Sequence, residues 1–467
     1  MSSPEPPETF SRRAGRREPL LERLALHRPE LRAWALYDWA NSAFFTTIVA
    51  AVFPIYYKTV AAADHPDALA RFAQVTSASM LLVALIAPLL GAMSDFAAAK
   101  KRFLAVFLTL GASATAGMFF VQQGDWLLAS LLFALGNVGV AASFVFYDSL
   151  LPSIAKGREL DRLSTSAYAI GYLGGGLLLA LNLAWIQRPE WFGLPSGPDL
   201  APAQRTLPAR LAFLSVAVWW VAFSIPLFRR VREPPRTLES DERLRMRSLA
   251  VALSRLRETF RELRRFRHAF LFLLAFLAYN DGIGTIIRMA TAYGEEIGIG
   301  RSDLIAAVLI VQFVGIPCAL FFGALAGRIG AKRGILVGLA AYLGICVFAW
   351  GMKETWHFYA LALLVAAVMG GTQALSRSLF ASMVPVHKAG EFFGLFSVLE
   401  RFAGVLGPMA FFLAIRLTGH SRLGILSLVV FFLAGAALLL PVDVEAGQRA
   451  AREAERGLRQ PEPGGAR

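Results

Sequence analysis

The 467-residue sequence is poor in charge and in cysteine. Only 17% of its residues are charged, against about 25% in an average soluble domain, while 56% are hydrophobic and the mean hydropathy is +0.53. A soluble protein of this size could not bury so much apolar surface, and the same composition excludes a largely disordered chain. The two cysteines exclude a disulfide scaffold and a cysteine-based zinc site. The composition therefore indicates a membrane protein with many spans.

Twelve segments are long and apolar enough to cross a bilayer as helices, which need about 20 mostly apolar residues. The runs are too long and continuous for the strands of a β-barrel. Those without a charge are Phe72–Ser94, Phe103–Gln122, Leu211–Phe228, Leu304–Gly327, Gly334–Met352 and Leu423–Pro441. Those with charges inside are Trp34–Tyr57, Trp126–Leu151, Ser164–Ile186, Ala269–Gly294, Trp356–Pro385 and Phe392–Leu417. The sequence predicts an all-α, multi-pass membrane protein.

Most of the 47 Lys and Arg residues fall on one side of the predicted membrane, in the N-terminal tail, in alternate loops and in the C-terminal tail. Because cytoplasmic segments carry the excess of Lys and Arg, we expect both termini in the cytoplasm. This topology accounts for the net charge of +14, so we expect no nucleic-acid partner. Residues 1–33 lack an apolar run, and we expect no cleavable signal peptide.

Residues 229–268 divide the chain into two groups of six spans. Within them Leu249, Leu253, Leu256 and Phe260 recur at helical spacing, with Arg on the other faces. We expect an amphipathic helix on anionic lipid of the inner leaflet; a solvated charged linker is the alternative. The predicted parts are a cytoplasmic tail 1–33, an N-terminal bundle 34–228, a linker 229–268, a C-terminal bundle 269–441 and a cytoplasmic tail 442–467.

The two groups of spans look related. Gly91–Asp95 aligns with Gly323–Gly327, and at the same offset Lys100–Lys101 aligns with Lys332–Arg333. Two parallel six-helix halves are the plan of the major facilitator superfamily, in which the substrate lies between the halves and access alternates as they rock. The chain resembles this superfamily, and the resemblance implies its fold of two pseudo-symmetric six-helix bundles.

The loop Gly91–Arg102 resembles the motif between spans two and three of that superfamily, although Phe96 stands where a basic residue is usual and Ala98 where glycine is usual. Gly91 permits close helix packing, and Asp95 can cap a neighbouring helix and pair with Arg across the bundle. We predict a conformational switch formed by Gly91, Asp95, Lys100, Lys101 and Arg102. The alternative is a plain loop that only sets topology.

Several motifs resemble the vacuole-effluxer-like branch of the superfamily, which includes the fungal autophagy-related amino-acid effluxer and bacterial relatives. The motifs are Trp34–Phe44, Phe146–Pro152, Gly171–Gly176, Tyr279–Gly282, Ile287–Met289, Gly370–Ser378 and Glu391–Leu395. The resemblance implies solute efflux, with amino acids the class suggested for the fungal member. It does not imply the substrate of a bacterial relative.

Few charges interrupt the spans, and each costs about 2.5–3.5 kcal/mol at a helix centre on insertion scales, so it should face a cavity or a partner. These charges are Asp38, Asp148, Asp281, Glu400, Arg288, Arg377 and Arg401. Polar residues share a helical face with several of them, in the spans that line the central cavity in this superfamily. The faces are Asp38, Asn41, Ser42 and Thr46; Asp281, Thr285 and Arg288; Gln373, Ser376 and Arg377; and Ser397, Glu400 and Gly404.

An amino acid offers a carboxylate, which Arg377 or Arg288 could bind, and an ammonium group, which Asp38 or Asp281 could bind. Alternatively the charges pair with each other as gate salt bridges, for example Arg377 with Glu400. The predicted substrate-binding or gating residues are Asp38, Asn41, Asn280, Asp281, Arg288, Gln373, Arg377 and Glu400. All six His fall in loops or at span ends, so Asp38 and Asp281 are the candidates for proton coupling.

No phosphate-binding loop pattern occurs in the sequence, which favours secondary active transport. We expect a transporter, not an enzyme, that moves a small polar or zwitterionic solute, with no cofactor and no metal. A transport-dead receptor or scaffold and a membrane-embedded lipid-modifying enzyme are the alternatives. We expect a monomer, and the excess of Arg over Lys favours a bacterial inner membrane.

Overall fold

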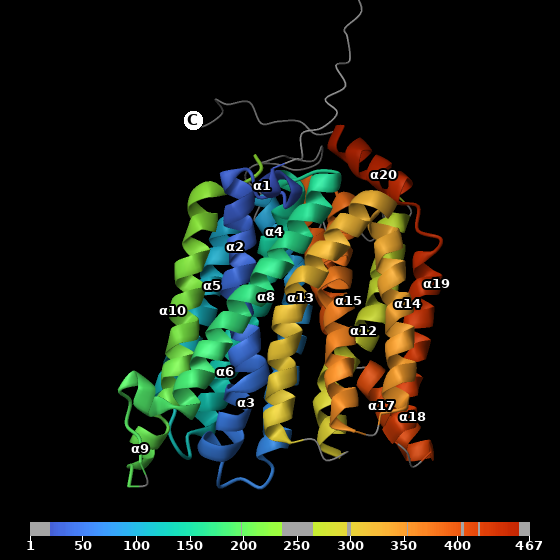
Figure 1. Cartoon of the computed structure of the whole chain (residues 1–467). Coiled ribbons are helices and arrows are strands. Elements are labelled where there is room, and N and C mark those ends of the chain that lie inside the picture. Colours follow the sequence, from blue (N-terminus) through green and yellow to red (C-terminus); the bar gives the residue numbers. More distant parts are fainter. Residues whose placement is uncertain are drawn as a thin grey trace, which may run out of the picture.

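The computed structural model describes residues 19–197, 199–235, 265–296, 300–352, 354–402, 406–418 and 421–456. Every regular element within these ranges is a helix. Figure 1 shows the long helices side by side in two groups, with the first part of the chain on the left and the second part on the right. The all-helical, two-bundle architecture predicted from the sequence is confirmed.

The left-hand group, named here the N-half, contains the helices from α2 to α10. They are α2 (Pro29–Ala43), the π-helical η1 (Phe44–Ala51), α3 (Phe53–Tyr56), η2 (Tyr57–Ala61), α4 (Ala68–Phe96), α5 (Lys100–Gly117), η3 (Met118–Phe120), α6 (Trp126–Ser149), α7 (Leu151–Ile154), α8 (Arg158–Gln187), η4 (Pro189–Phe192), α9 (Pro202–Arg205) and α10 (Leu207–Arg230).

The right-hand group, named here the C-half, contains the helices from α12 to α19. They are α12 (Arg267–Glu296), α13 (Arg301–Ile329), α14 (Ala331–Trp350), α15 (Thr355–Ser382), η6 (Val386–Lys388), α16 (Ala389–Phe402), α17 (Leu406–Thr418), α18 (Ser421–Ser427) and α19 (Val429–Leu439). Two further helices, α1 (Leu20–Arg23) and α20 (Val444–Arg456), precede and follow the bundles.

Eleven helices of the described chain are long and apolar enough to cross a membrane, and each falls on a predicted window. The twelfth window, Leu423–Pro441, corresponds to α18 and α19. The stretch Leu423–Leu439 bends by 61° into α20, and counting this bent pair as one span gives twelve. The spans account for the apolar composition.

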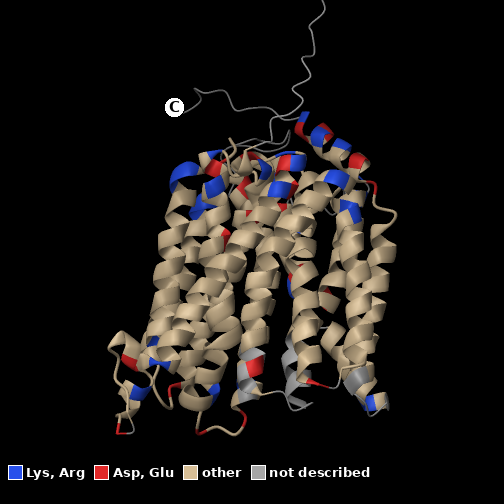
Figure 2. Ribbon diagram, in the orientation of Figure 1, with Lys and Arg blue, Asp and Glu red and all other residues tan. Residues whose placement is uncertain are grey.

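Charged residues gather at the two ends of the bundle, and the middle is almost free of them (Figure 2). Large apolar side chains of the middle region point outward; Leu85 of α4 is 70% exposed and Val106 of α5 is 63% exposed. Such a surface would be unfavourable in water but matches the hydrocarbon layer of a bilayer.

Helices α1 and α20 lie at the same end of the bundle, which we call the terminal face; the opposite end is the far face (Figure 1). Helix α20 is joined to the α15–α16 connection, because Val386 N donates a hydrogen bond to Glu455 Oε1 at 2.9 Å. At its start, Ala446 N donates to Asp443 Oδ1 at 2.9 Å, which lowers the pKa of the Asp443 carboxyl. The predicted tail 442–467 therefore contains an ordered helix.

The predicted linker 229–268 begins against α5. Lys101 Nζ donates a hydrogen bond to Val231 O at 2.9 Å, and Lys101 N donates to the Glu233 carboxylate. Residues 236–264, which include the expected amphipathic stripe, lie outside the described residues. The anionic-lipid surface stays a prediction.

Candidate functional site

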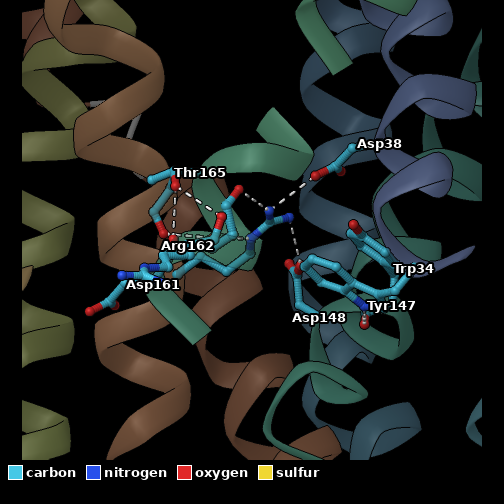
Figure 3. A network of polar contacts seen from close by, with 10 residues as sticks. Trp34, Asp38, Tyr147, Asp148, Asp161, Arg162 and Thr165 are labelled. Carbon is cyan, nitrogen blue, oxygen red and sulfur yellow. Dashed lines mark hydrogen bonds and ion pairs between the residues drawn. The ribbon is translucent and has the colours of Figure 1, made fainter. Parts of the chain in front are cut away.

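A buried ion cluster joins the two halves at Arg377 of α15. Its Nη2 donates to Asp38 Oδ2 at 3.0 Å, and its Nη1 donates to Asp148 Oδ1 at 3.3 Å. Its Nε donates to Ser164 Oγ at 2.9 Å. Arg377 is 3% exposed, and the two acids are 6% and 8% exposed. Figure 3 shows Asp38 and Asp148 reaching the guanidinium from two different helices.

Three aromatic rings, named here the aromatic cage, surround the same guanidinium. Arg377 Cζ lies 4.8 Å from the ring centroid of Trp34, 5.6 Å from that of Tyr147 and 4.6 Å from that of Tyr168. A guanidinium over an aromatic face gains cation–π attraction, more so when both groups are shielded from water. Figure 3 shows Trp34 and Tyr147 beside the Asp148 side of the cluster.

The charges of this cluster do not balance within it. Two carboxylates face one guanidinium, so one negative charge is in excess when both acids are ionised. Breaking a buried ion pair by removing one partner costs about 3–5 kcal/mol, because it leaves a charge without compensation. The cluster therefore joins the halves, and a separation of the halves would take the charges of Asp38, Asp148 and Arg377 away from these partners.

Two further hydrogen bonds join the halves next to Arg377. Ser164 Oγ donates to Ala374 O at 2.8 Å, and Ser378 Oγ donates to Asp161 Oδ1 at 2.5 Å. Helix α15 ends at Ser382, a little over one turn after Arg377, so the whole group lies toward the terminal face. These contacts join the halves at that end.

The predicted switch loop forms a second connection between the halves. Asp95 Oδ2 accepts a hydrogen bond from Glu391 N at 2.9 Å, in the first turn of α16, where the helix dipole favours a negative charge. Lys100 Nζ lies 3.0 Å from Asp95 Oδ1 and donates to Val386 O at 3.4 Å. The ion-pair partner of Asp95 is thus Lys100 of the same loop, where an Arg across the bundle was expected. Lys101 holds the start of the linker, and Arg102 is exposed.

Gly91 allows this connection to form. A Cβ atom on Gly91 would lie 2.0 Å from the carbonyl oxygen of Gly390, so α4 and α16 cross with their backbones almost in contact. Such a close approach needs small residues on both helices. The carboxylate of Asp95 reaches the start of α16 because the two backbones are this close.

Two predicted amide residues lie one helical turn from the ion cluster. Asn41 follows Asp38 by three positions in α2, and Gln373 precedes Arg377 by four positions in α15. Both are displaced toward the far face, because α2 runs away from the terminal face and α15 runs toward it. Asn41 Nδ2 is buried without a hydrogen-bond partner among the described residues. Gln373 is half-buried.

The polar stripe of the seventh span faces another helix of the C-half. Asp281 Oδ2 accepts a hydrogen bond from Gly407 N at 2.8 Å, and a Cβ on Gly407 would lie 2.1 Å from Thr285 Oγ1. Asp281 and Thr285 therefore pack on the start of α17. Asn280 beside them is buried, whereas the side chain of Arg288 lies outside the part of the chain that the structure describes.

The example pairing of Arg377 with Glu400 needs correction. The partners of Arg377 are Asp38 and Asp148, whereas Glu400 Oε2 lies 3.8 Å from Arg401 Nη2 and its side chain is 39% exposed. Thr46, which was predicted to share the cavity-lining face of Asp38, contacts another helix of the N-half. Its Oγ1 donates a hydrogen bond to Gly175 O of α8 at 3.1 Å. Helical spacing gave the face of each residue but not the helix that this face meets.

Five residues around the Arg377 guanidinium were not among the predicted site residues: Trp34, Tyr147, Asp148, Ser164 and Tyr168. Asp148 was recognisable as a charge inside the window Trp126–Leu151, next to Tyr147 in a motif shared with the effluxer branch. Ser164 and Tyr168 carry no charge, and no sequence signal marks them. They enter the site because α8 packs beside α2 and α15.

Residues 68–452 match the family described as "Vacuole effluxer Atg22 like". The chain belongs to this family. The uncharacterized MFS-type transporter YxiO of Bacillus subtilis is 34% identical over 416 residues, covering 88% of this chain and 94% of YxiO. Autophagy-related protein 22-1 of Aspergillus niger is 22% identical, covering 84% of this chain and 75% of the fungal protein.

Solved structures of the major facilitator superfamily share the fold of this Atg22-like chain. The proton:xylose symporter XylE superposes with a TM-score of 0.64 at 15% identity, covering 90% of this chain and 94% of XylE. The transporter FucP superposes with a TM-score of 0.63 at 12% identity, covering 89% of this chain and 98% of FucP. The Atg22-like chain is a multi-pass membrane protein and a secondary transporter of a small-molecule solute.

Proposed function

We propose that this Atg22-like transporter exports a small zwitterionic, amino-acid-like solute by alternating access, with its terminal face at the cytoplasm of a bacterial inner membrane. Lys and Arg concentrate at the terminal face, which supports this orientation (Figure 2). The description of the family as effluxers supports export. The observation that carries the proposal is the buried cluster of Arg377, Asp38 and Asp148, which joins the halves and must open before a solute can pass from that side.

In this proposal Asn41 and Gln373 contact the solute. They come from opposite halves and lie one turn beyond the ion cluster on the side of the far face, where a solute would rest while the terminal face is closed. An amide both donates and accepts hydrogen bonds, so it can serve either end of a zwitterion. Asn280 and Glu400 are further candidates on α12 and α16.

Proton coupling is proposed at Asp38 together with Asp148. A coupling group must change its surroundings during the cycle, and these two acids lose Arg377 when the halves separate. Of the two predicted candidates Asp38 is favoured, because its ion pair with Arg377 crosses between the halves, whereas the hydrogen bond that Asp281 accepts from Gly407 N lies within the C-half. The excess negative charge of the cluster gives a proton a place to bind.

Flux measurements in proteoliposomes test this function. Liposomes loaded with labelled amino acids should lose label faster when an inward proton gradient is imposed, and empty liposomes serve as the control. Any solute exchange that Asp38→Asn retains should no longer respond to the gradient, because the carboxylate that takes up the proton is gone. If no amino acid, peptide or organic ion moves under any gradient, the proposed function is wrong.

Gln373→Ala should raise the KM for the solute about tenfold and leave kcat nearly unchanged. Loss of one hydrogen bond to a charged solute group is worth about 1.5–3 kcal/mol, and Gln373 makes no ion pair that closure would need. The measurement is initial transport rate against solute concentration. Gln123→Ala, an exposed glutamine in a far-face loop, is the matched control. A normal KM in the Gln373 variant would remove this residue from the solute site.

A further inference from the structure

Among the described residues, side chains of the half opposite to its own make hydrogen-bond and cation–π contacts with the Arg377 guanidinium. Asp38 and Trp34 come from α2, Asp148 and Tyr147 from α6, and Ser164 and Tyr168 from α8. Arg377 enters this group from α15 of the C-half. When the halves separate at the terminal face, the N-half keeps two carboxylates and three aromatic rings that have lost their cation.

The N-half holds most of this group in place by its own contacts. Trp34 stacks on Tyr147 with ring centroids 4.4 Å apart, and Trp34 Nε1 donates to Tyr147 O at 3.0 Å. Tyr37 packs on Tyr147 at 4.7 Å, and its hydroxyl donates to Ser143 Oγ at 2.8 Å. None of these contacts involves the C-half, so we expect the group to keep its shape after Arg377 leaves.

We propose that the N-half carries a binding site for an organic cation, formed by Asp38, Asp148 and the aromatic cage. Arg377 fills it while the terminal face is closed, and a guanidinium- or amine-bearing solute fills it while that face is open. This inference rests on the alternating access of the proposed function. It adds that the N-half recognises the cationic group of the solute.

The chemistry of the group favours an organic cation over a metal ion. Carboxylates on two helices match the several N–H donors of a guanidinium, and aromatic faces attract a weakly hydrated cation. A hard cation such as Ca²⁺ takes six to eight oxygen ligands in typical protein sites. Three rings around the site would take the places that such ligands need.

Arg377 and the bound solute then compete for one volume. Closure of the terminal face brings Arg377 back into the site, so the solute must leave it toward Asn41 and Gln373, on the side of the far face. The apparent affinity of a cation for the wild-type protein falls with the fraction of time that Arg377 occupies the site. Removal of the Arg377 side chain should therefore expose the site permanently.

Methylguanidinium, which reproduces the end of an Arg side chain, tests this inference on purified full-length protein. Its dissociation constant, measured by thermal shift and by calorimetry, should be at least about tenfold lower for Arg377→Ala than for the wild type. N-methylurea has a similar planar shape without the charge and should not bind. Sodium chloride at equal ionic strength controls for screening.

The acids and the rings provide the second half of the test. Adding Asp148→Asn or Trp34→Leu to Arg377→Ala should abolish methylguanidinium binding. Equal binding by wild type and Arg377→Ala, or binding that survives both additions, would overturn the inference. Arg377→Gln removes the same charge with a better-matched volume and serves if the alanine variant does not fold.

The binding assay does not depend on transport. If methylguanidinium binds Arg377→Ala as expected while no solute moves in proteoliposomes, the cation site is supported and the export function is contradicted. If amino acids are transported but methylguanidinium fails to bind any folded variant, the export function is supported and the cation site is contradicted.

Discussion

Arg377→Ala should reduce solute transport by about 100-fold or more and leave the protein open at the terminal face. The substitution removes both ion pairs and the hydrogen bond to Ser164. Two buried carboxylates lose their cation, at a cost of about 3–5 kcal/mol to the closed state. Because each half folds around its own helices, the substitution should destabilise the closed state relative to the open state. It should have only a weak effect on the free energy of unfolding.

The state of the terminal face can be measured directly. Spin labels at positions 158 and 333 would report the separation of α8 and α14, since both native residues are exposed and line one cavity on that face. The labels need a background in which Cys318 and Cys346 are replaced. The distance distribution should move to longer values in Arg377→Ala, and Arg188→Ala, at an exposed arginine near the far face, is the matched control.

The single acid variants sharpen the same prediction. Asp38→Asn and Asp148→Asn each leave Arg377 with one carboxylate, so the charges of the cluster balance. We expect each to lengthen the label distance less than Arg377→Ala does, with a loss of closed-state stability of about 1–3 kcal/mol for the missing charged hydrogen bond. If Arg377→Ala closed and transported like the wild type, the cluster would not be the gate.

The sequence alone predicts the fold almost completely, because spans are a property of local composition. Each apolar window is occupied by one helix or by two or more consecutive helices, and Arg377, predicted inside a span, is buried between the helices. Which residues share one face of a helix is also decided locally. Asp38 and Asn41 lie on one face of α2 because they are three residues apart in the same helix.

The partners of these residues could not be predicted in the same way. A face of one helix does not identify the helix that it meets, since that depends on how all the spans pack. Asp281 accepts a hydrogen bond from Gly407 N of its own half, a contact that the polar stripe of the seventh span did not predict. Arg377 meets Asp148 and the uncharged Ser164, which only the packing of α6, α8 and α15 brings together.

Gly91→Ala should impair closure of the terminal face and lower transport by about 10-fold to 100-fold. The new Cβ would lie 2.0 Å from Gly390 O and 2.6 Å from Gly390 C, which are backbone atoms of α16 and cannot rotate away. The helices must move apart, which costs about 1–3 kcal/mol in a well-packed contact and weakens the hydrogen bond from Glu391 N to Asp95. The measurements are initial transport rate and the distance between labels at 158 and 333.

Gly344→Ala is the matched control, because a Cβ at this α14 position meets no atom within 4 Å. Gly390→Ala tests the same contact from the other side, where the new Cβ would lie 2.6 Å from Gly91 O. Since this contact lies between the halves, both variants should open the terminal face while leaving the Arg377 cluster chemically intact. If both variants gave normal label distances, the Arg377 cluster would close the terminal face without the switch loop. The switch loop would then be no part of the gate.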